Sequence, residues 1–122
     1  MKRLIREMPR VVPAAAIGAV LIIVVALLLF VSRDTNNAPH AEGSVRPGNV
    51  VVGEVVLFDA RNSSDPDGDD LNYLWTIQGG VSSSSQVFEY IFPNPGNYTV
   101  ILKVRDTGGL EDHETFLVFV SS

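Results

Sequence analysis

The sequence predicts an all-β sandwich preceded by one transmembrane α-helix, and three observations support this prediction. Residues 11–31 contain no charged side chain, residues 32–48 are polar and carry two prolines and two glycines, and residues 49–122 form short alternating runs separated by turn residues. No window of the last segment has the period of an amphipathic helix. Many short alternating runs at this spacing are typical of a β-sandwich.

The apolar segment reads VVPAAAIGAVLIIVVALLLFV and has the length of a membrane span. As a helix it would be ~32 Å long, against a hydrocarbon core of ~30 Å. The ten residues before it carry four basic side chains and one acidic side chain. This balance predicts a cytoplasmic N-terminus, a single pass through the cell membrane and export of everything that follows. Because no small-x-small cleavage site follows the segment, an uncleaved anchor is favoured over a signal peptide.

The expected exported part is acidic and has no cysteine. Residues 32–122 contain five basic and 13 acidic side chains, which gives a net charge of −8. Nucleic-acid phosphates would be repelled by such a domain, so we expect no nucleic-acid partner. Without cysteine the domain needs a hydrophobic core, with the help of a bound ion as one further source of stability.

The alternating runs predict which side chains face the core and which face outward. Four aromatic side chains fall on inward faces and are expected to form the core, namely Phe58, Tyr73, Trp75 and Tyr98. Four large apolar side chains fall on the opposite, outward faces of neighbouring strands, namely Leu74, Ile101, Leu117 and Phe119. Outward apolar residues on adjacent strands indicate a contact patch for another protein or for a second copy. Scattered surface hydrophobic residues are the alternative explanation. The serine run 82–85 is expected to form a loop.

Several blocks of the sequence, spaced in order, resemble the PKD (polycystic kidney disease) domain family. These blocks are NNAP at 36–39, VGEVVLF at 52–58, SSDPDGD at 63–69, YLW at 73–75 and PGNYTVILKVRD at 95–106. The resemblance covers about residues 36–120 and implies an immunoglobulin-like β-sandwich. One block departs from the family pattern, because WTIQGG at 75–80 stands where the family has W-D-F-G-D-G.

The acidic cluster at 65–70 has three possible explanations. A catalytic carboxylate pair is disfavoured, because these acids lie on a Pro/Gly-rich turn open to water and not in an apolar cleft. A polar turn is the second explanation, since Asp side chains cap turns. Calcium binding is the third, because hard cations take carboxylate and amide oxygens. Some PKD domains bind calcium, and the resemblance implies a structural Ca²⁺ site formed by Asn36, Asp65, Asp67 and Asp106.

The sequence contains two N-x-S/T sequons, at Asn62 and Asn97. Both fall in the part that we expect to be exported, so both asparagines are glycosylation candidates. No Ser/His/Asp arrangement, phosphate loop or nucleotide motif is visible, so we expect no enzymatic activity.

These observations predict a membrane-anchored binding or spacer module at the cell surface, making protein–protein or protein–glycan contacts. Residues 1–10 would be the cytoplasmic head, 11–31 the transmembrane helix, 32–48 the linker and first irregular strand, and 49–122 the sandwich. One alternative is an archaeal type IV pilin-like fibre subunit, whose basic head is trimmed. Another alternative is a non-catalytic accessory subunit of a membrane complex.

Overall fold

A computed structural model of the chain describes residues 35–122. The head expected at 1–10 and the span expected at 11–31 lie outside this range. Within the described range no helix is long and apolar enough to cross a membrane. Residues 36–122 form one compact unit. This unit includes most of the segment 32–48, which was expected to hold the linker and the first irregular strand.

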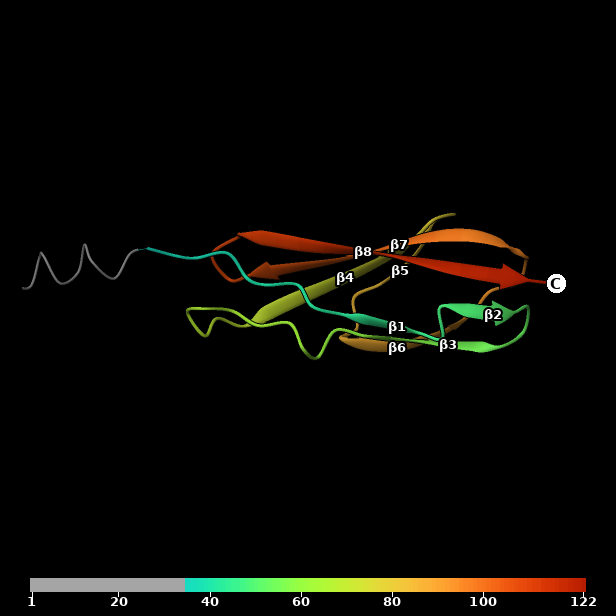
Figure 1. Ribbon diagram of the computed structural model, residues 1–122. Helices are drawn as coiled ribbons and strands as arrows, with labels where there is room; N and C mark the ends of the chain where they lie inside the picture. The colour runs from blue at the N-terminus through green and yellow to red at the C-terminus, as the bar shows by residue number, and fades with distance from the viewer. Residues whose placement is uncertain (1–34) are drawn as a thin grey trace, which may run out of the picture. The chain divides into compact units, whose positions relative to one another are not determined.

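Within residues 35–122, eight strands form two sheets that pack face to face (Figure 1). The smaller sheet has the order β1-β3-β6, with β1 at Ser44–Arg46, β3 at Val55–Asp59 and β6 at Val87–Ile91. The larger sheet has the order β2-β8-β7-β4-β5. Its strands are β2 at Asn49–Val51, β4 at Leu71–Ile77, β5 at Val81–Ser83, β7 at Gly96–Asp106 and β8 at Glu111–Ser121. The predicted all-β sandwich is therefore confirmed for the described residues.

The core lies between the two inward faces, as the alternation of the sequence predicts. Val56 and Phe58 of β3 and Trp75 of β4 are fully buried. The Phe58 and Trp75 rings meet edge to face, with their centroids 5.5 Å apart. Edge-to-face contacts of this kind add to the apolar area that the rings bury. Tyr98 packs at the margin of the core with its ring on Phe92 and donates its hydroxyl hydrogen to the Asn94 carbonyl at 2.8 Å.

The longest strands, β7 and β8, connect the two ends of the domain. They pair in antiparallel register from Gly96–Val120 at one end to Arg105–Glu111 at the other. Short β2 runs parallel to the end of β8 and forms one edge of the sheet. At the other edge, Ser82 and Ser83 belong to β5, so the prediction of a loop at 82–85 was wrong at these two positions. Their backbone groups pair with β4, which outweighs the low strand propensity of serine.

Candidate functional site

Three carboxylates converge at the end of the sandwich where β7 finishes. Asp65 and Asp69 come from the turn between β3 and β4, and Asp106 is the last residue of β7. One oxygen from each of the three side chains lies within 4.8 Å of the other two. Like charges at this separation repel each other, so the arrangement needs hydrogen bonds or a cation to offset the repulsion.

Asp106 is the organising residue of this group and is only 2 % exposed. Its Oδ1 accepts a hydrogen bond from the Leu110 backbone N–H at 2.8 Å, which closes the turn between β7 and β8. Its Oδ2 accepts from the Asn36 side-chain amide at 2.9 Å, which ties the start of the domain to the end of β7. Buried charged groups are tolerated when they are hydrogen-bonded in this way.

The loop that carries Asp65 is folded around that side chain. Asp65 Oδ1 accepts from the backbone N–H groups of Asp67 at 2.8 Å and of Asp69 at 3.2 Å. Asp65 Oδ2 is buried and has no hydrogen-bond partner among the described residues. A buried carboxylate oxygen without a donor costs free energy, and a cation or an ordered water would remove that cost.

Electrostatics and burial act together on Asp69. Partial burial raises the pKa of the Asp69 carboxyl above its usual value, and the charges of Asp65, Asp106, Asp67 and Asp70 raise it further. Each of these causes disfavours the ionised form. Burial and the neighbouring carboxylates thus both favour the protonated form of Asp69.

The leading segment covers one side of the cluster. Asn37 donates to both oxygens of Asp67, from its backbone at 2.7 Å and from its side chain at 3.1 Å. Gly108 leaves room for Asn36, because a Cβ at this position would overlap the Asn36 amide nitrogen and lie 3.4 Å from Asp106 Oδ1. The absence of a side chain at 108 is thus what lets the leading segment reach Asp106.

Of the four residues that the resemblance indicates as metal ligands, the structure brings three together. Asp65 and Asp106 belong to the cluster and Asn36 contacts Asp106, whereas Asp67 is engaged by Asn37. Asp69 takes the third place in the cluster and was not among the four. Its signal in the sequence is its position in the alternating series Asp65, Asp67, Asp69.

The four apolar residues expected to face outward all lie on the outer face of the larger sheet. Leu74, Ile101, Leu117 and Phe119 are 38, 41, 56 and 45 % exposed. They come from three neighbouring strands, β4, β7 and β8. Ile101 of β7 lies opposite Thr76 of β4 on one side and opposite Thr115 of β8 on the other. In a neighbouring row, Leu117 of β8 lies opposite Thr99 of β7. We call Leu74, Ile101, Leu117 and Phe119 the outer patch.

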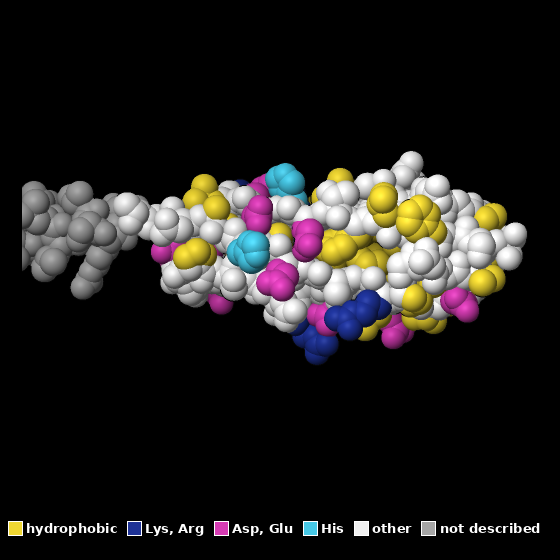
Figure 2. Space-filling model, in the orientation of Figure 1, with side chains coloured by type: hydrophobic (Ala, Val, Ile, Leu, Met, Phe, Trp, Pro, Cys, Tyr) yellow, Lys and Arg dark blue, Asp and Glu magenta, His cyan; other side chains and the backbone are white. Residues whose placement is uncertain are grey.

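Charged side chains surround the outer patch unevenly. Lys103 and Arg105 lie near Glu111, with Nζ of Lys103 3.4 Å from a Glu111 oxygen, toward the end that carries Asp106. Toward the other end the face is free of lysine and arginine, because its cross-strand rows hold Asn97, Thr99, Leu117 and Phe119. In Figure 2, where the two sheets are seen edge-on, hydrophobic side chains are visible near both ends of the domain, and histidine and acidic side chains lie between them.

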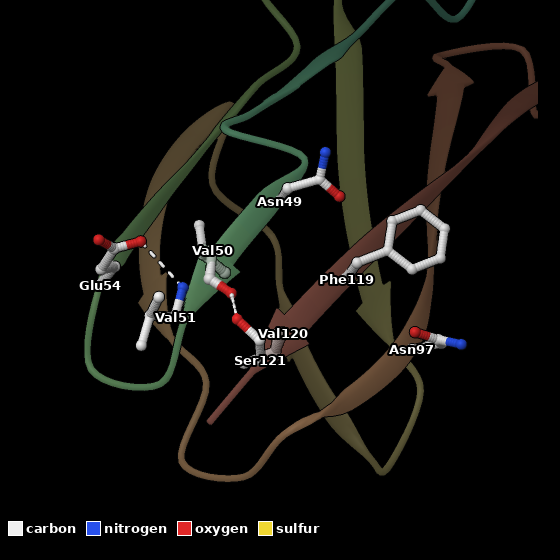
Figure 3. A pocket seen from close by; sticks show the side chains of 8 residues that line it. All are labelled: Asn49, Val50, Val51, Glu54, Asn97, Phe119, Val120 and Ser121. Atoms are coloured by element: carbon white, nitrogen blue, oxygen red, sulfur yellow. Dashed lines mark hydrogen bonds between the residues drawn. The ribbon is translucent and has the colours of Figure 1, made fainter.

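A hollow of about 390 Å³ lies at the end of the domain opposite the carboxylates. Its lining residues are Asn49, Val50, Val51, Glu54, Asn97, Phe119, Val120 and Ser121 (Figure 3). Sequence reasoning did not find this hollow, because it forms where the parallel strand β2 joins β8.

The two sequons lie on the surface, Asn62 in the turn after β3 and Asn97 at the start of β7.

Comparison with known proteins agrees with this architecture. The family model described as the PKD domain matches residues 36–120. A microbial collagenase of Vibrio alginolyticus is 32 % identical over 88 residues, which are 72 % of this chain and 11 % of the collagenase. Collagenase ColA of Bacillus cereus is 30 % identical over 74 residues, which are 61 % of this chain and 8 % of the enzyme. The chain thus spans about a tenth of the length of these relatives.

Solved structures resemble it over a similar length. A structure described with carbohydrate-binding modules of the β-sandwich superfamily superimposes with a TM-score of 0.68 at 34 % identity, covering 72 % of this chain and 36 % of that one. The PKD1 domain of the Vibrio cholerae metalloprotease PrtV superimposes with a TM-score of 0.60 at 28 % identity, covering 70 % of this chain and all of that domain. The match covers the whole of that domain, and residues 36–122 of this chain form one compact unit. Taken together, the fold and the match over 36–120 establish that the chain belongs to the PKD domain family.

Proposed function

We propose that this chain is a non-catalytic binding and spacer module whose outer patch contacts an extracytoplasmic partner. The observation that carries the proposal is the outer patch itself. Its four apolar side chains lie on three adjacent strands and each is more than a third exposed. The similar proteins include a microbial collagenase, of which the match covers 11 %, and a structure described with carbohydrate-binding modules, of which it covers 36 %. Those relatives support a role in contact with protein or glycan.

The charge distribution indicates why contact would occur on this face. The domain carries a large excess of negative charge, so most of its surface repels another acidic surface. The rows that hold Thr99, Leu117 and Ile101 are uncharged. Apolar surface removed from water in these rows contributes about 25 cal/mol per Å² without desolvation of an ionised group, whereas Leu74, the fourth member of the patch, lies opposite Lys103.

A charge substitution in the outer patch tests this proposal. The tagged full chain and its Leu117→Asp variant would be extracted from membranes, and copurifying proteins would be compared. We expect the variant to lose its partners by roughly tenfold or more, since a buried charge at an interface costs several kcal/mol. Val55→Asp is the matched control, because Val55 is 47 % exposed on β3 of the other sheet. Equal recovery of partners with both variants would contradict the proposal.

The membrane anchor is part of the same proposal. The apolar segment 11–31 would hold the chain in the bilayer as a single pass, with the head 1–10 in the cytoplasm and the domain outside. A type IV pilin-like subunit would have the same order of segments but a trimmed head. Sequencing the mature N-terminus separates the two. A retained Met1 supports the anchor, and loss of about ten residues would assign the chain to a fibre.

We further propose that the carboxylate cluster binds a structural calcium ion. Asp65, Asp69 and Asp106 would be the anionic ligands, since their oxygens already converge and Asp65 Oδ2 has no donor. An amide presents either its NH₂ or its oxygen to a given point, so rotation of the Asn36 side chain would supply a fourth oxygen. The bound ion would offset the repulsion among the acids and hold the leading segment against the turn after β7.

Thermal unfolding of residues 35–122 with calcium and with chelator tests the ion site. Extracellular calcium modules bind with dissociation constants of about 0.1–1 mM. At ten times the dissociation constant, binding would stabilise the domain by about 1.4 kcal/mol. Asp69→Asn should abolish most of that gain, whereas Asp70→Asn should keep it, because Asp70 is exposed and outside the three-acid group. No calcium-dependent shift in the unmodified domain would reject the site and leave the outer patch unaffected.

A further inference from the structure

We propose that the hollow formed by β2, β7 and β8 is a binding site for one ring of a neutral saccharide, stacked on Phe119. This inference rests on the proposed binding function and gives it a ligand class and a position. The site is separate from the carboxylate cluster. It uses one member of the outer patch, Phe119, together with polar residues that the patch does not include.

The strand register builds the site. Asn49 of β2 and Asn97 of β7 both lie directly opposite Phe119 of β8, one on each side. Residues directly opposite each other in a sheet point to the same face, so the three side chains form one row. Figure 3 shows the Phe119 ring between the two amide side chains. The ring is 45 % exposed, and both asparagines are exposed as well.

The chemistry of this row complements that of a sugar ring. A pyranose has an apolar C–H face and an edge of hydroxyl groups that both donate and accept hydrogen bonds. The face of a phenyl ring carries partial negative charge and attracts the C–H groups of an apolar surface. Each asparagine offers two donors and one acceptor, which matches hydroxyl groups of either sense. A ring stacked on Phe119 would therefore have a polar partner on each side.

The remaining lining residues narrow the ligand class. Glu54, which lies on the far side of β2 from Phe119 (Figure 3), accepts the Val51 backbone N–H at 2.9 Å. No lysine or arginine lines the hollow, so a phosphate, a sulfate or a uronate would meet a carboxylate without a compensating cation. The volume of about 390 Å³ lies at the small end of the range for ligand sites. These features favour one neutral sugar ring.

The position of the site makes it accessible to a ligand on another surface. Asn97 and Asp106 lie near opposite ends of β7, and nine residues of strand span about 30 Å. Asn36, the first residue of the compact unit, contacts Asp106. The hollow therefore lies at the end of the domain far from the point where the chain enters it.

The saccharide could come from two sources, and the chemistry at Phe119 is the same for both. It could belong to a separate polysaccharide, or it could be attached to Asn97, which begins a sequon. The two sources differ in whether the unglycosylated domain binds an added sugar. They also differ in whether the native protein carries a glycan mass on Asn97.

The first experimental arm titrates unglycosylated residues 35–122 with neutral probes, followed by NMR. The probes are cellotetraose and chitotriose, with dextran sulfate as the anionic comparison. We expect the amide signals of Asn49, Asn97 and Phe119 to shift with a dissociation constant on the order of 1 mM, as for a shallow site with few contacts. Phe119→Ala should weaken binding roughly tenfold or more. Leu110→Ala is the matched control and should leave binding unchanged, because Leu110 is 40 % exposed but lies outside both the hollow and the outer patch.

The second arm examines Asn97 in the native protein by mass spectrometry. A glycan on Asn97 whose sugar protons show Overhauser contacts with the Phe119 ring assigns the attached source, and Thr99→Val should remove both signals. In the first arm, the probes are added up to a concentration about ten times the expected dissociation constant of 1 mM. If neither arm then detects a sugar on Phe119, the inference is overturned. Equal weakening by Phe119→Ala and Leu117→Ala would also overturn it, because the contact would then be made by the outer patch. Loss of partners in Leu117→Asp with no saccharide binding would reject the saccharide site alone and retain the proposed function.

Discussion

The two ends of β7 have opposite physical character. At the Asp106 end, three carboxylates converge, the leading segment is hydrogen-bonded to the turn, and Gly108 is packed against Asn36. At the Asn97 end, the row formed by Asn49, Phe119 and Asn97 is neutral and exposed, and its phenyl ring is open to solvent. The comparison indicates that residues at the first end mainly stabilise the domain, whereas residues at the second end are free to bind a ligand.

The largest expected effect on stability comes from alanine substitution at the Asp106 end of β7. Asp106→Ala would leave the Leu110 N–H and the Asn36 amide without their acceptor. We expect a loss of about 3 kcal/mol in the free energy of unfolding, since each hydrogen bond to a charged group contributes about 1.5–3 kcal/mol and some carboxylate repulsion is relieved. Urea denaturation of residues 35–122 in the presence of chelator measures this loss.

Asn97→Ala is the counterpart at the other end of the strand. Because Asn97 is exposed, we expect a change of less than about 0.5 kcal/mol. Similar losses for the two variants would contradict the division between the ends.

Two glycines give a smaller but cleaner contrast. Neither Gly108 nor Gly48 has the positive φ that favours glycine, so each substitution by alanine tests only the space around the new methyl group. At 108 the methyl group would displace Asn36, and we expect a cost of about 2 kcal/mol. At 48 the nearest atom would be the Leu117 carbonyl oxygen at 3.9 Å, so Gly48→Ala should be neutral or stabilise by about 0.5 kcal/mol. The same denaturation series compares them, and a neutral Gly108→Ala would show that Asn36 is not held in place.

Much of this fold could be predicted from the sequence because alternation determines which face each strand buries. Trp75 and Leu74 are neighbours in the chain, yet the first is fully buried and the second is 38 % exposed, as the period of two requires. The same rule places Ile101, Leu117 and Phe119 on the outer face. These assignments depend only on local geometry once a strand forms.

The remaining features depend on contacts that are distant in the sequence or on loop conformation. Asp67 and Asp69 are equivalent in the alternating acidic series, and only the folded turn, with Gly68 at φ +76°, decides which of them faces Asp106. The bond from Asn37 to Asp67 joins residues 30 positions apart. The parallel pairing of β2 with β8, which creates the hollow, has no local signal either.

Truncation of the phenyl ring sharpens the description of the Asn97 end. Phe119→Ala should cost about 1 kcal/mol of stability, because only about half of the side chain is buried. Val118→Ala, one residue earlier on β8, should cost about 2 kcal/mol, because Val118 is fully buried. If Phe119→Ala proved as costly as Val118→Ala, the ring would be part of the core and a role in recognition would lose its support.

The smallest expected effect is the pH dependence that Asp69 gives to the Asp106 end. Its pKa in the folded domain is raised, first by burial and then by the surrounding carboxylates, so the folded state holds this proton more tightly than the unfolded state. The corresponding stabilisation is complete below the unfolded pKa of Asp and is lost as the pH rises through the higher folded pKa. Asp59 behaves in the opposite sense, because hydrogen bonds from Arg61 lower its pKa to about 2, and its contribution is lost as the pH falls toward that value.

Unfolding curves in chelator across the mildly acidic range should therefore show a small decline in stability with rising pH that Asp69→Asn removes. Saturating calcium should abolish the decline, because a bound cation favours the ionised carboxylate. Arg61→Gln, which acts on Asp59 alone, should leave the decline in place. A decline that survives in Asp69→Asn would show that its source is not the convergence of acids at this end of β7.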